Sequence, residues 1–359
     1  MSSEAPPHLE VQILCPACRT PLQATTPQSW TCDGCSATYR GLRGIPDLRI
    51  EDDVYLDNEA DWAIAEALDA EFDRHDFDGL LARFFELSGD VPEADRSRYA
   101  RHIRTAPGRV GGWIGPLGEV GEGAGLDLGC GSGSFLASAQ ATGRTWVGVD
   151  IAMRWLLVAR KRLDEGGLHR ARLVCGGSER LPFADGQFAA LVSGDVIEHV
   201  RDQAATIGET FRVLKPGGRA MFATPNRFSL GAEPHVGVFG VGYLPRAWMG
   251  WYVRVWTGRD YRAIRNLGAG EFSQLLKSSP FGGGSILAPL LPAADLAHFS
   301  PLKRRLGQLY NRLASTWAGQ WLARRIGPIL HAVVERPSPP VQSSILPTRP
   351  GSRGRAAGA

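Results

Sequence analysis

No run of 18 apolar residues occurs in the sequence, so we expect no transmembrane helix. The first ten residues, MSSEAPPHLE, lack both the basic stretch and the apolar core of a secretory signal peptide. Only 6 of 359 residues are cysteine, which excludes a disulfide-dense miniprotein, and 43% hydrophobic content excludes disorder of the whole chain. We expect a folded protein of the reducing cytoplasm, where clustered cysteines more often bind metal than form disulfides.

The sequence also lacks an excess of either charge, because 40 Lys and Arg face 37 Asp and Glu for a net charge of +3. This balance hides two opposite segments. Residues 51–100 contain 16 acidic and 4 basic side chains, whereas residues 301–359 contain 1 acidic and 10 basic side chains. The first 120 residues are acidic overall, which makes them a poor surface for nucleic-acid phosphates.

Composition and hydrophobic spacing divide the chain into five predicted segments. They are a Cys-bearing unit (1–50), a helical cap (51–120), an alternating core (121–225), a substrate-side or lid region that completes the same domain (226–335) and a disordered Pro-rich tail (336–359). Within 121–225 strand-like runs alternate with helical runs, which predicts an α/β fold with a parallel sheet. The expected strands are Leu126–Leu128, Trp146–Asp150, Ala171–Cys175, Phe188–Ser193 and Arg219–Ala223.

Four of the cysteines form two Cys-x-x-Cys pairs separated by 13 residues. Each pair can place two thiolates on one ion, and four thiolates in tetrahedral geometry favour Zn²⁺. Such an ion would stabilise a unit of about 40 residues that buries little core of its own. We therefore predict a structural zinc site, with a redox pair or unmetallated thiols as the alternative. Its ligands would be Cys15, Cys18, Cys32 and Cys35.

Residues 11–50 resemble a family of small zinc-ribbon proteins that activate tRNA and rRNA methyltransferases. The shared features are the paired cysteines, Tyr39 and the run Gly-Ile-Pro-Asp-Leu at 44–48. A bacterial rRNA guanine-N1 methyltransferase also begins with a zinc ribbon fused to its catalytic domain. The resemblance leaves open whether this ribbon docks a substrate or is only structural.

The motif Leu-Asp-Leu-Gly-Cys-Gly-Ser-Gly at 126–133 contains the first expected strand of the core and the glycine-rich turn that follows this strand. Glycines at a strand-to-helix turn let a nucleotide-type cofactor approach the backbone closely. The Gly-Lys-Ser/Thr of a Walker A loop is absent, and the third glycine comes one residue too early for the dinucleotide fingerprint. The next strand ends at Asp150, whose carboxylate can bind both hydroxyls of a ribose or, alternatively, cap a helix over 152–163.

Five ordered motifs resemble class I S-adenosylmethionine (SAM)-dependent methyltransferases of the UbiE/UbiG-like (type 11) group. They are the glycine turn at 126–133, Gly-Val-Asp at 148–150, Glu-Arg-Leu-Pro-Phe at 179–183, Ser-Gly-Asp-Val-Ile-Glu-His-Val at 193–200 and Leu-Lys-Pro-Gly-Gly at 214–218. The resemblance covers residues 120–225 well and the flanks poorly. It implies a Rossmann-like sheet with helices on both faces, and SAM as the cofactor.

The same resemblance implies which residues would bind SAM. Gly129, Gly131 and Gly133 would hold the methionine moiety, Asp127 its amino group, Asp150 the ribose, and Gly177, Ser178 and Glu179 the adenine edge, with Cys130, Ile151, Ser193 and Asp195 completing the set. Family members commonly carry an acidic residue where this chain has Gly177, so a backbone group or Ser178 must take its place.

Asp195, Glu198 and His199 resemble the Glu-x-x-Glu-His motif with which ubiquinone-biosynthesis O-methyltransferases bind a divalent metal, with a shorter first side chain. This likeness implies a metal or acid/base site. The alternative is a helix start, with Asp195 as the cap and Glu198 as the capping-box acid. His235 follows the fifth expected strand and, because histidine titrates near neutral pH, is the preferred general base. Its alternative is a hydrogen-bonded loop histidine.

Aromatic and basic side chains are interleaved in the last third of the chain. Trp248, Trp251 and Trp256 lie among arginines, and leucines and tryptophans near helical spacing lie among Lys and Arg in residues 302–335. Such a pattern suits a membrane interface or the mouth of a greasy substrate site. The alternatives are a buried lid helix with a solvated basic face, and an RNA contact.

The sequence therefore predicts an O-methyltransferase for a small or lipid-linked metabolite, in the cytoplasm or at the inner face of the membrane. One alternative is an rRNA or tRNA base methyltransferase that uses the ribbon for docking, although nucleic acid is the less favoured partner. The other is a non-catalytic scaffold with a SAM-binding fold. The sequence indicates neither the acceptor nor the oligomeric state.

Overall fold

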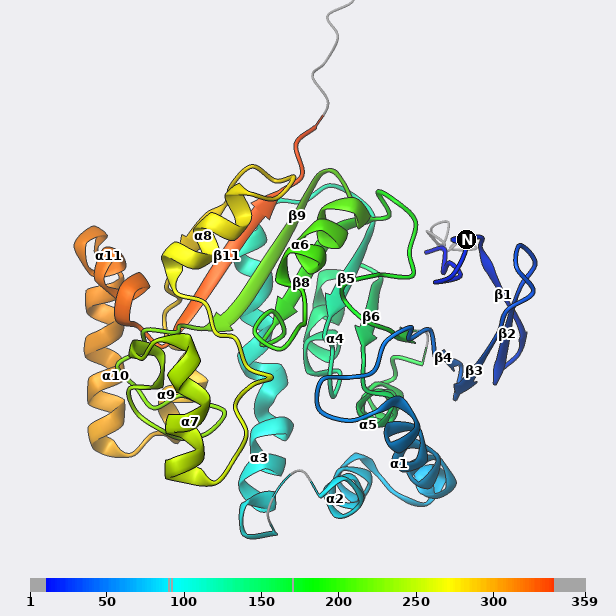
Figure 1. Ribbon diagram of the computed structural model, residues 1–359, viewed down its shortest axis with the longest axis horizontal. Helices are drawn as coiled ribbons and strands as arrows, with labels where there is room; N and C mark the ends of the chain where they lie inside the picture. The colour runs from blue at the N-terminus through cyan, green and yellow to red at the C-terminus, as the bar shows by residue number, and fades with distance from the viewer. Residues whose placement is uncertain (1–10, 90, 92, 170, 339–359) are drawn as a thin grey trace, which may run out of the picture.

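The computed structural model describes residues 11–89, 91, 93–169 and 171–338. Within them a small antiparallel sheet and a larger seven-stranded sheet lie side by side, with helices around the larger one (Figure 1). The predicted tail falls almost wholly on residues 339–359, outside the described residues. No helix of the described part combines the length and the apolar character needed to cross a bilayer.

The small sheet is the Cys-bearing unit. Its strands follow each other in the order β1-β2-β3-β4 and pair antiparallel. They are β1 (Leu22–Thr26), β2 (Ser29–Cys32), β3 (Thr38–Leu42) and β4 (Ile45–Pro46). We call residues 11–48 the ribbon.

The large sheet has the strand order β10-β11-β9-β8-β5-β6-β7. The five strands from β9 to β7 are parallel to one another. β11 pairs antiparallel with β9, and β10 pairs antiparallel with β11 at the edge of the sheet. The bounds are β5 (Ala124–Leu128), β6 (Trp146–Asp150), β7 (Arg172–Cys175), β8 (Phe188–Gly194), β9 (Leu214–Pro225), β10 (Ser285–Leu287) and β11 (Ile329–Glu335). The five expected strands lie within or overlap β5 to β9, and the predicted α/β fold is confirmed.

Helices cover both faces of this sheet because strand residues alternate between two cores. In β9, Met221 joins the core that contains α1, α2, α4 and α5, whereas Phe222 joins the core that contains α6 and α8. The α-helices are α1 (Asn58–Glu71), α2 (Phe77–Ser88), α3 (Glu93–Val110), α4 (Ser134–Ala139), α5 (Met153–Glu165), α6 (Gln203–Val213), α7 (Arg246–Thr257), α8 (Ala269–Lys277), α9 (Ala293–His298), α10 (Pro301–Ala314) and α11 (Trp317–Ile326). Short 3₁₀ turns are Phe72–Arg74, Gly111–Leu117, Gln140–Thr142 and Val241–Tyr243.

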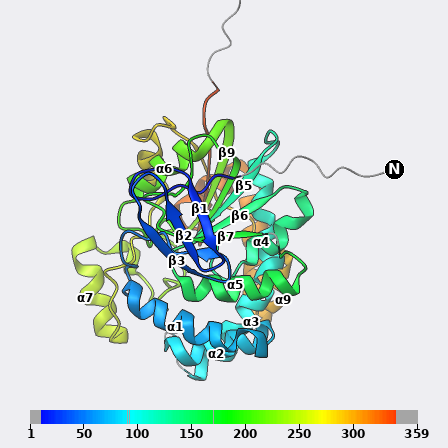
Figure 2. The ribbon, with the colours of Figure 1, turned by 90° about the vertical axis from the view of Figure 1, so that its right-hand side faces the viewer.

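The ribbon packs against the β7 edge of the large sheet (Figures 1 and 2). Asp47 forms a parallel bridge with Cys175, and the Leu48 N–H donates to the Cys175 carbonyl over 2.8 Å. On the other side of the ribbon, the Leu14 N–H donates to the Pro182 carbonyl over 2.8 Å. The ribbon thus covers an edge strand whose backbone groups would otherwise need water.

One local prediction from the sequence is wrong. Asp195 and Glu198 do not start a helix, because residues 195–200 form turns and α6 begins only at Gln203. The cap of α6 is Asp202, whose carboxylate accepts from the Ala204 and Ala205 N–H groups. Asp195 and Glu198 are therefore not needed as caps.

Candidate functional site

The glycine turn connects β5 to α4 at the carboxyl edge of the sheet. Gly129 and Gly131 have positive φ angles of 77° and 46°, which side chains with a Cβ rarely adopt. A Cβ on Gly129 would also lie 2.0 Å from Cγ2 of Val196. The third glycine, Gly133, begins α4, and a Cβ there would lie 3.1 Å from that of Ala159 in α5. Gly133 also has a positive φ, of 71°, so all three glycines shape the turn, and the third in addition allows two helices to pack closely.

Asp150 holds this turn in place from the end of β6. Its Oδ2 accepts from the Gly131 N–H over 2.8 Å, and its Oδ1 accepts from the Ala152 N–H over 2.9 Å. Burial raises the pKa of Asp150 to about 6. Each carboxylate oxygen can accept a further hydrogen bond, so the ribose role expected for Asp150 is compatible with its local role at the start of α5.

Asp127 lies in β5, two residues before Gly129, and is only 2% exposed. Its Oδ2 is buried with no hydrogen-bond partner among the described residues. Burial raises the pKa of Asp127 well above the usual range, and the nearby Asp150 adds to this. A buried carboxylate oxygen without a donor suits a ligand that brings its own ammonium group.

A cavity of about 340 Å³ opens beside the turn. Its lining includes most of the predicted cofactor set, namely Gly129, Gly131, Asp150, Ile151, Gly177, Ser178, Glu179 and Asp195. Ser193 does not line it, because this residue is 2% exposed within β8. The Ser178 hydroxyl bonds Glu179 and Thr206, so it is already engaged. Sequence reasoning missed residues 50–55, which cover the cavity from the loop between the ribbon and α1.

A second cavity, of about 680 Å³, meets the first one at Gly129, Gly131 and Asp195. Asp127 and Cys130 line it, together with α3 and the segment 287–292. His331 of β11 also lines it, and burial lowers the pKa of this histidine to about 4. Of the cap residues, His102 lines this cavity, whereas Arg104 is paired with Asp78. Only the sheet order brings His331 here, so no local signal in the sequence could have indicated it.

Glu198, His199 and His235 come together next to the first cavity. The Nε2 atoms of His199 and His235 are 3.2 Å apart. Glu198 Oε1 lies 3.8 Å from His199 Nε2 and 4.0 Å from His235 Nε2. Glu198 is fully buried, and this Oε1 has no hydrogen-bond partner within the described part of the chain. Two imidazole nitrogens and one carboxylate oxygen around a common point are a ligand set for a divalent metal.

The other ring nitrogens of both histidines are held from outside. Glu233 Oε1 lies 2.6 Å from His235 Nδ1, and the Tyr55 hydroxyl bonds His199 Nδ1. Burial, helped by the neighbouring His235, lowers the pKa of His199 to about 4. These partners point both Nε2 atoms toward Glu198, an arrangement common around bound metals.

The metal set implied by the sequence needs one correction. Asp195 does not belong to the metal-compatible group, which contains His235 in its place. Asp195 lies at φ +55° where β8 ends, and its N–H donates to the Ala223 carbonyl. Asp195 lines both cavities instead, which is consistent with the cofactor role predicted for it.

A model of the family described as "Methyltransferase domain" matches residues 126–222, the segment that carries the glycine turn, Asp150 and the Glu198–His199 pair. We call this segment the methyltransferase domain because of this similarity. The match confirms the predicted resemblance to the UbiE/UbiG-like group and, with it, SAM as the cofactor of such domains.

Curated relatives match part of this chain. The ubiquinone biosynthesis O-methyltransferase of Thiobacillus denitrificans is 32% identical over 102 residues, 28% of this chain and 44% of that protein. The demethylmenaquinone methyltransferase of Bacillus velezensis is 35% identical over 107 residues, 29% of this chain and 46% of that protein. The chain thus spans less than half the length of these relatives. A solved structure of Haemonchus contortus phosphoethanolamine N-methyltransferase 2 with SAM has a TM-score of 0.40 at 18% identity, covering 63% of this chain and 51% of that chain.

The ribbon brings its four cysteines together about a common centre, and their sulfurs all lie within 4.8 Å of one another. Cys15 and Cys35 are 3.6 Å apart and Cys18 and Cys32 are 3.3 Å apart, and all four are free thiols. A zinc ion with Zn–S bonds of about 2.3 Å requires sulfurs at about this spacing. The residues therefore fit the predicted structural zinc.

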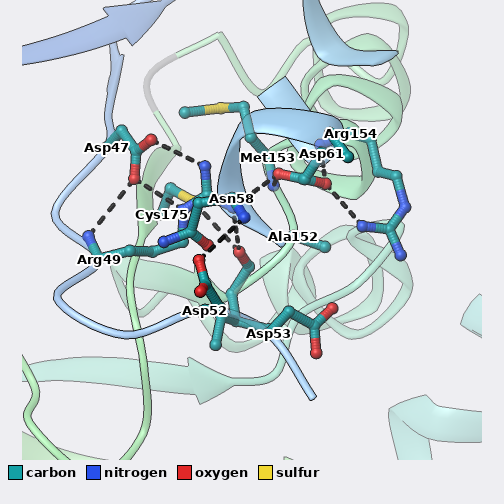
Figure 3. A network of polar contacts seen from close by, with 12 residues as sticks. Asp47, Arg49, Asp52, Asp53, Asn58, Asp61, Ala152, Met153, Arg154 and Cys175 are labelled. Carbon is teal, nitrogen blue, oxygen red and sulfur yellow. Dashed lines mark hydrogen bonds and ion pairs between the residues drawn. The ribbon is translucent and has the colours of Figure 1, made fainter. Parts of the chain in front are cut away.

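A buried polar network joins the ribbon to the methyltransferase domain (Figure 3). Arg49 donates to Asp47 over 2.8 Å and to Asp61 of α1 over 2.7 Å, and the side chains of Arg49 and Asp61 are 1% and 0% exposed. Asp61 also accepts from Arg154 over 2.6 Å and from the Met153 N–H over 2.9 Å. One carboxylate thus connects the ribbon, the cap and the first turn of α5, next to Asp150.

Proposed function

We propose that this protein transfers a methyl group from SAM to an oxygen of a small or lipid-linked metabolite. The observation that carries the proposal is the meeting of the two cavities at Gly129, Gly131 and Asp195. The first cavity has the ribose and adenine residues on its wall and the second leads away from the methionine end. A donor in the first and an acceptor in the second would approach each other at this junction.

Bound SAM supplies a methyl group on a positively charged sulfur. The residues of this chain then have to hold the donor, align the acceptor and exclude water. Asp150 would orient the ribose and Asp127 would pair with the amino group, which would satisfy its orphaned Oδ2. Residues 50–55 would close the cofactor cavity from above, since they already line it.

We propose that Glu198, His199 and His235 prepare the acceptor hydroxyl. These three residues would hold a divalent ion, which would supply a Lewis acid that lowers the pKa of a hydroxyl bound to it. In the absence of an ion, His235 would accept the proton, with Glu233 holding its Nδ1–H and stabilising the positive charge. Both routes need the Nε2 atom of His235.

RNA as the acceptor is supported less well. Three ribbon arginines, and Arg49 just after the ribbon, are paired with carboxylates of the same chain: Arg19 with Glu209, Arg40 with Glu59, Arg43 with Asp69 and Asp73, and Arg49 with Asp47 and Asp61. Phosphate binding would have to displace these partners.

SAM binding measured by calorimetry on the full chain tests the proposed function directly. We expect binding of one SAM per chain, and methylation of quinol- or phenol-type acceptors in an assay with radiolabelled SAM. Binding without turnover on any hydroxyl acceptor would contradict the proposed O-methylation. Absence of SAM binding would favour a non-catalytic scaffold.

Asp150 gives the cofactor site a pH dependence. Because its pKa is raised to about 6 and the ionised carboxylate is needed to accept from the ribose hydroxyls, SAM affinity should be full above that pH and fall as pH drops through 6. Asp150→Ala should weaken SAM binding by about tenfold to a hundredfold at pH 8. Calorimetry between pH 5 and 8 measures both effects.

Asp53, Asp127 and Arg154 also influence the charge near Asp150. Asp150→Asn serves as the control, because it keeps the side-chain size but cannot titrate. We expect a weaker and flatter pH profile for this variant. The same fall below pH 6 in wild type and Asp150→Asn would assign the titration to another group.

His235→Ala should reduce kcat by about a hundredfold while SAM affinity changes less than about twofold. His235 does not line the cofactor cavity, so only the step at the acceptor should suffer. His169→Ala is the matched control, since this histidine is exposed and pairs only with Asp164. Unchanged turnover of His235→Ala would end the proposed role.

Metal content distinguishes the two routes. After dialysis against Zn²⁺, the wild type should hold two ions per chain and His235→Ala one, because the four-cysteine site is intact in both. One ion in both proteins would assign His235 to proton transfer alone.

A further inference from the structure

The two consecutive helices α10 and α11 carry six large exposed apolar side chains. On α10 the spacing of Leu302, Leu306, Leu309 and Leu313 places all four along one stripe of the helix. Trp317 and Trp321 continue on α11. The six residues are 47–85% exposed, and several large apolar side chains exposed together, unlike single scattered ones, mark an interaction site. We call them the α10–α11 face.

Polar contacts fix this face outward. The Tyr310 hydroxyl donates to the Pro289 carbonyl over 2.9 Å, and the Asn311 side chain bonds both the N–H and the carbonyl of Leu291. On α11, the Gln320 amide donates to the Ala288 carbonyl over 2.9 Å. These contacts lie on the inner side, beside the buried Gly307 and Ala314. The alternative of a buried lid helix is therefore wrong for this stripe.

The segment around the face is purely basic. Residues 301–326 contain six Lys and Arg and no Asp or Glu. By helical position Arg305 and Arg312 border the leucine stripe, and no ion pair of the described residues involves either of them. Arg325 lies over the Trp321 ring at 3.6 Å. A helix with leucine and tryptophan on one face and arginine beside that face is typical of segments that lie in a lipid headgroup layer.

We propose that the α10–α11 face docks on a membrane surface that contains anionic lipid. The apolar stripe would enter the boundary between headgroups and acyl chains, and the bordering arginines would pair with lipid phosphates. A second copy of this chain suits the face less well, because self-pairing would bring two purely basic segments together. The ribbon takes no part, since it lies at the opposite edge of the large sheet (Figure 1).

The segment 287–292, which α10 and α11 contact on their inner side, lines the second cavity. Leu287 and Leu290 line that cavity and are 43% and 49% exposed, and Gln320 of α11 contributes to the same wall. Docking would bring this apolar rim close to the lipid. If the cavity holds the acceptor, as the proposed function has it, a lipid-linked acceptor could enter without crossing water; docking itself does not depend on that function.

Flotation with vesicles tests the docking. The full chain is mixed with vesicles of phosphatidylcholine and phosphatidylglycerol at 7:3, and with pure phosphatidylcholine, and the floated fraction is measured. Leu309→Glu/Trp317→Glu should partition at least about tenfold more weakly than wild type, and Arg305→Glu/Arg312→Glu should lose the preference for the anionic vesicles. Trp251→Glu is the matched control, because Trp251 of α7 is 67% exposed outside the face.

The readouts separate docking from folding and from catalysis. SAM affinity and the melting temperature of each variant should match those of wild type. Absence of wild-type binding to anionic vesicles overturns the proposal, as does a loss of binding in Trp251→Glu but not in Leu309→Glu/Trp317→Glu. A wild-type dimer in sedimentation that Leu309→Glu/Trp317→Glu dissociates, with no vesicle binding, would assign the face to a second copy.

Discussion

Replacing Asp61 with alanine should lower the free energy of unfolding by about 3–5 kcal/mol, the range for removing one partner of a buried ion pair. Asp61 is fully buried and accepts from Arg49, from Arg154 and from the Met153 N–H. Without its carboxylate, the guanidinium of Arg49 stays buried with Asp47 as its remaining acidic partner. Urea denaturation followed by tryptophan fluorescence measures the loss.

The control for Asp61→Ala lies on the same helix. Glu59 pairs with Arg40 in a salt bridge, but its side chain is 78% exposed, so Glu59→Ala should cost no more than about 1 kcal/mol. SAM affinity should also fall in Asp61→Ala, because the Arg49 guanidinium donates to the Ile151 carbonyl in the wall of the cofactor cavity. Equal free energies of unfolding of the two variants would show that the network in Figure 3 does not stabilise the fold.

Removal of zinc should unfold the ribbon. Apparent binding energies of structural zinc are about 10–16 kcal/mol in small zinc domains, more than so small a core supplies. The buried apolar residues of the ribbon are few, among them Leu14, Trp30 and Ile45. Cys32→Ser, or a strong chelator, should therefore abolish amide protection over β1 to β3 in hydrogen exchange, and the zinc content should fall by one ion per chain.

The unfolding should reach the methyltransferase domain. Leu48 and Arg49 leave the ribbon directly for the β7 edge and the Asp61 network, so the melting temperature of the whole chain should also drop. Cys130→Ser is the control, because Cys130 is buried in the glycine turn outside the cluster and should not change the zinc content. Retained protection of β1 to β3 in metal-free Cys32→Ser would contradict a structural zinc.

Local patterns in the sequence were sufficient for the cofactor half. β5, the glycine turn and β6 follow from apolar runs, from positive-φ glycines and from a carboxylate at a strand end, signals that lie within a few residues of each other. The two Cys-x-x-Cys pairs are local in the same sense. Each of these features could be predicted because neighbours in the chain determine it.

His235 could be named from the sequence as a candidate base, but the side chains that meet across the fold could not be predicted in this way. His235 joins His199 from a separate loop, and His331 reaches the second cavity through the antiparallel pairing of β11 with β9. The exposure of the α10–α11 face likewise depends on contacts with residues 288–291. A helical pattern of leucines shows that one side is apolar, and only tertiary structure decides whether that side is covered.

The pairing of Ile329 with Pro225 has a consequence for how this protein can change. The chain between these two residues leaves β9 at its end and returns beside it at the start of β11, and of this excursion only β10 joins the large sheet among the described strands. Asn226 clasps the return, donating to the carbonyls of Pro328 and Gly327. The excursion carries His235, the segment 287–292 of the second-cavity wall and the α10–α11 face, whereas the glycine turn and Asp150 lie outside it. If the proposed function holds, substitutions or length changes within this one excursion would alter the acceptor side and leave the glycine turn and Asp150 unchanged.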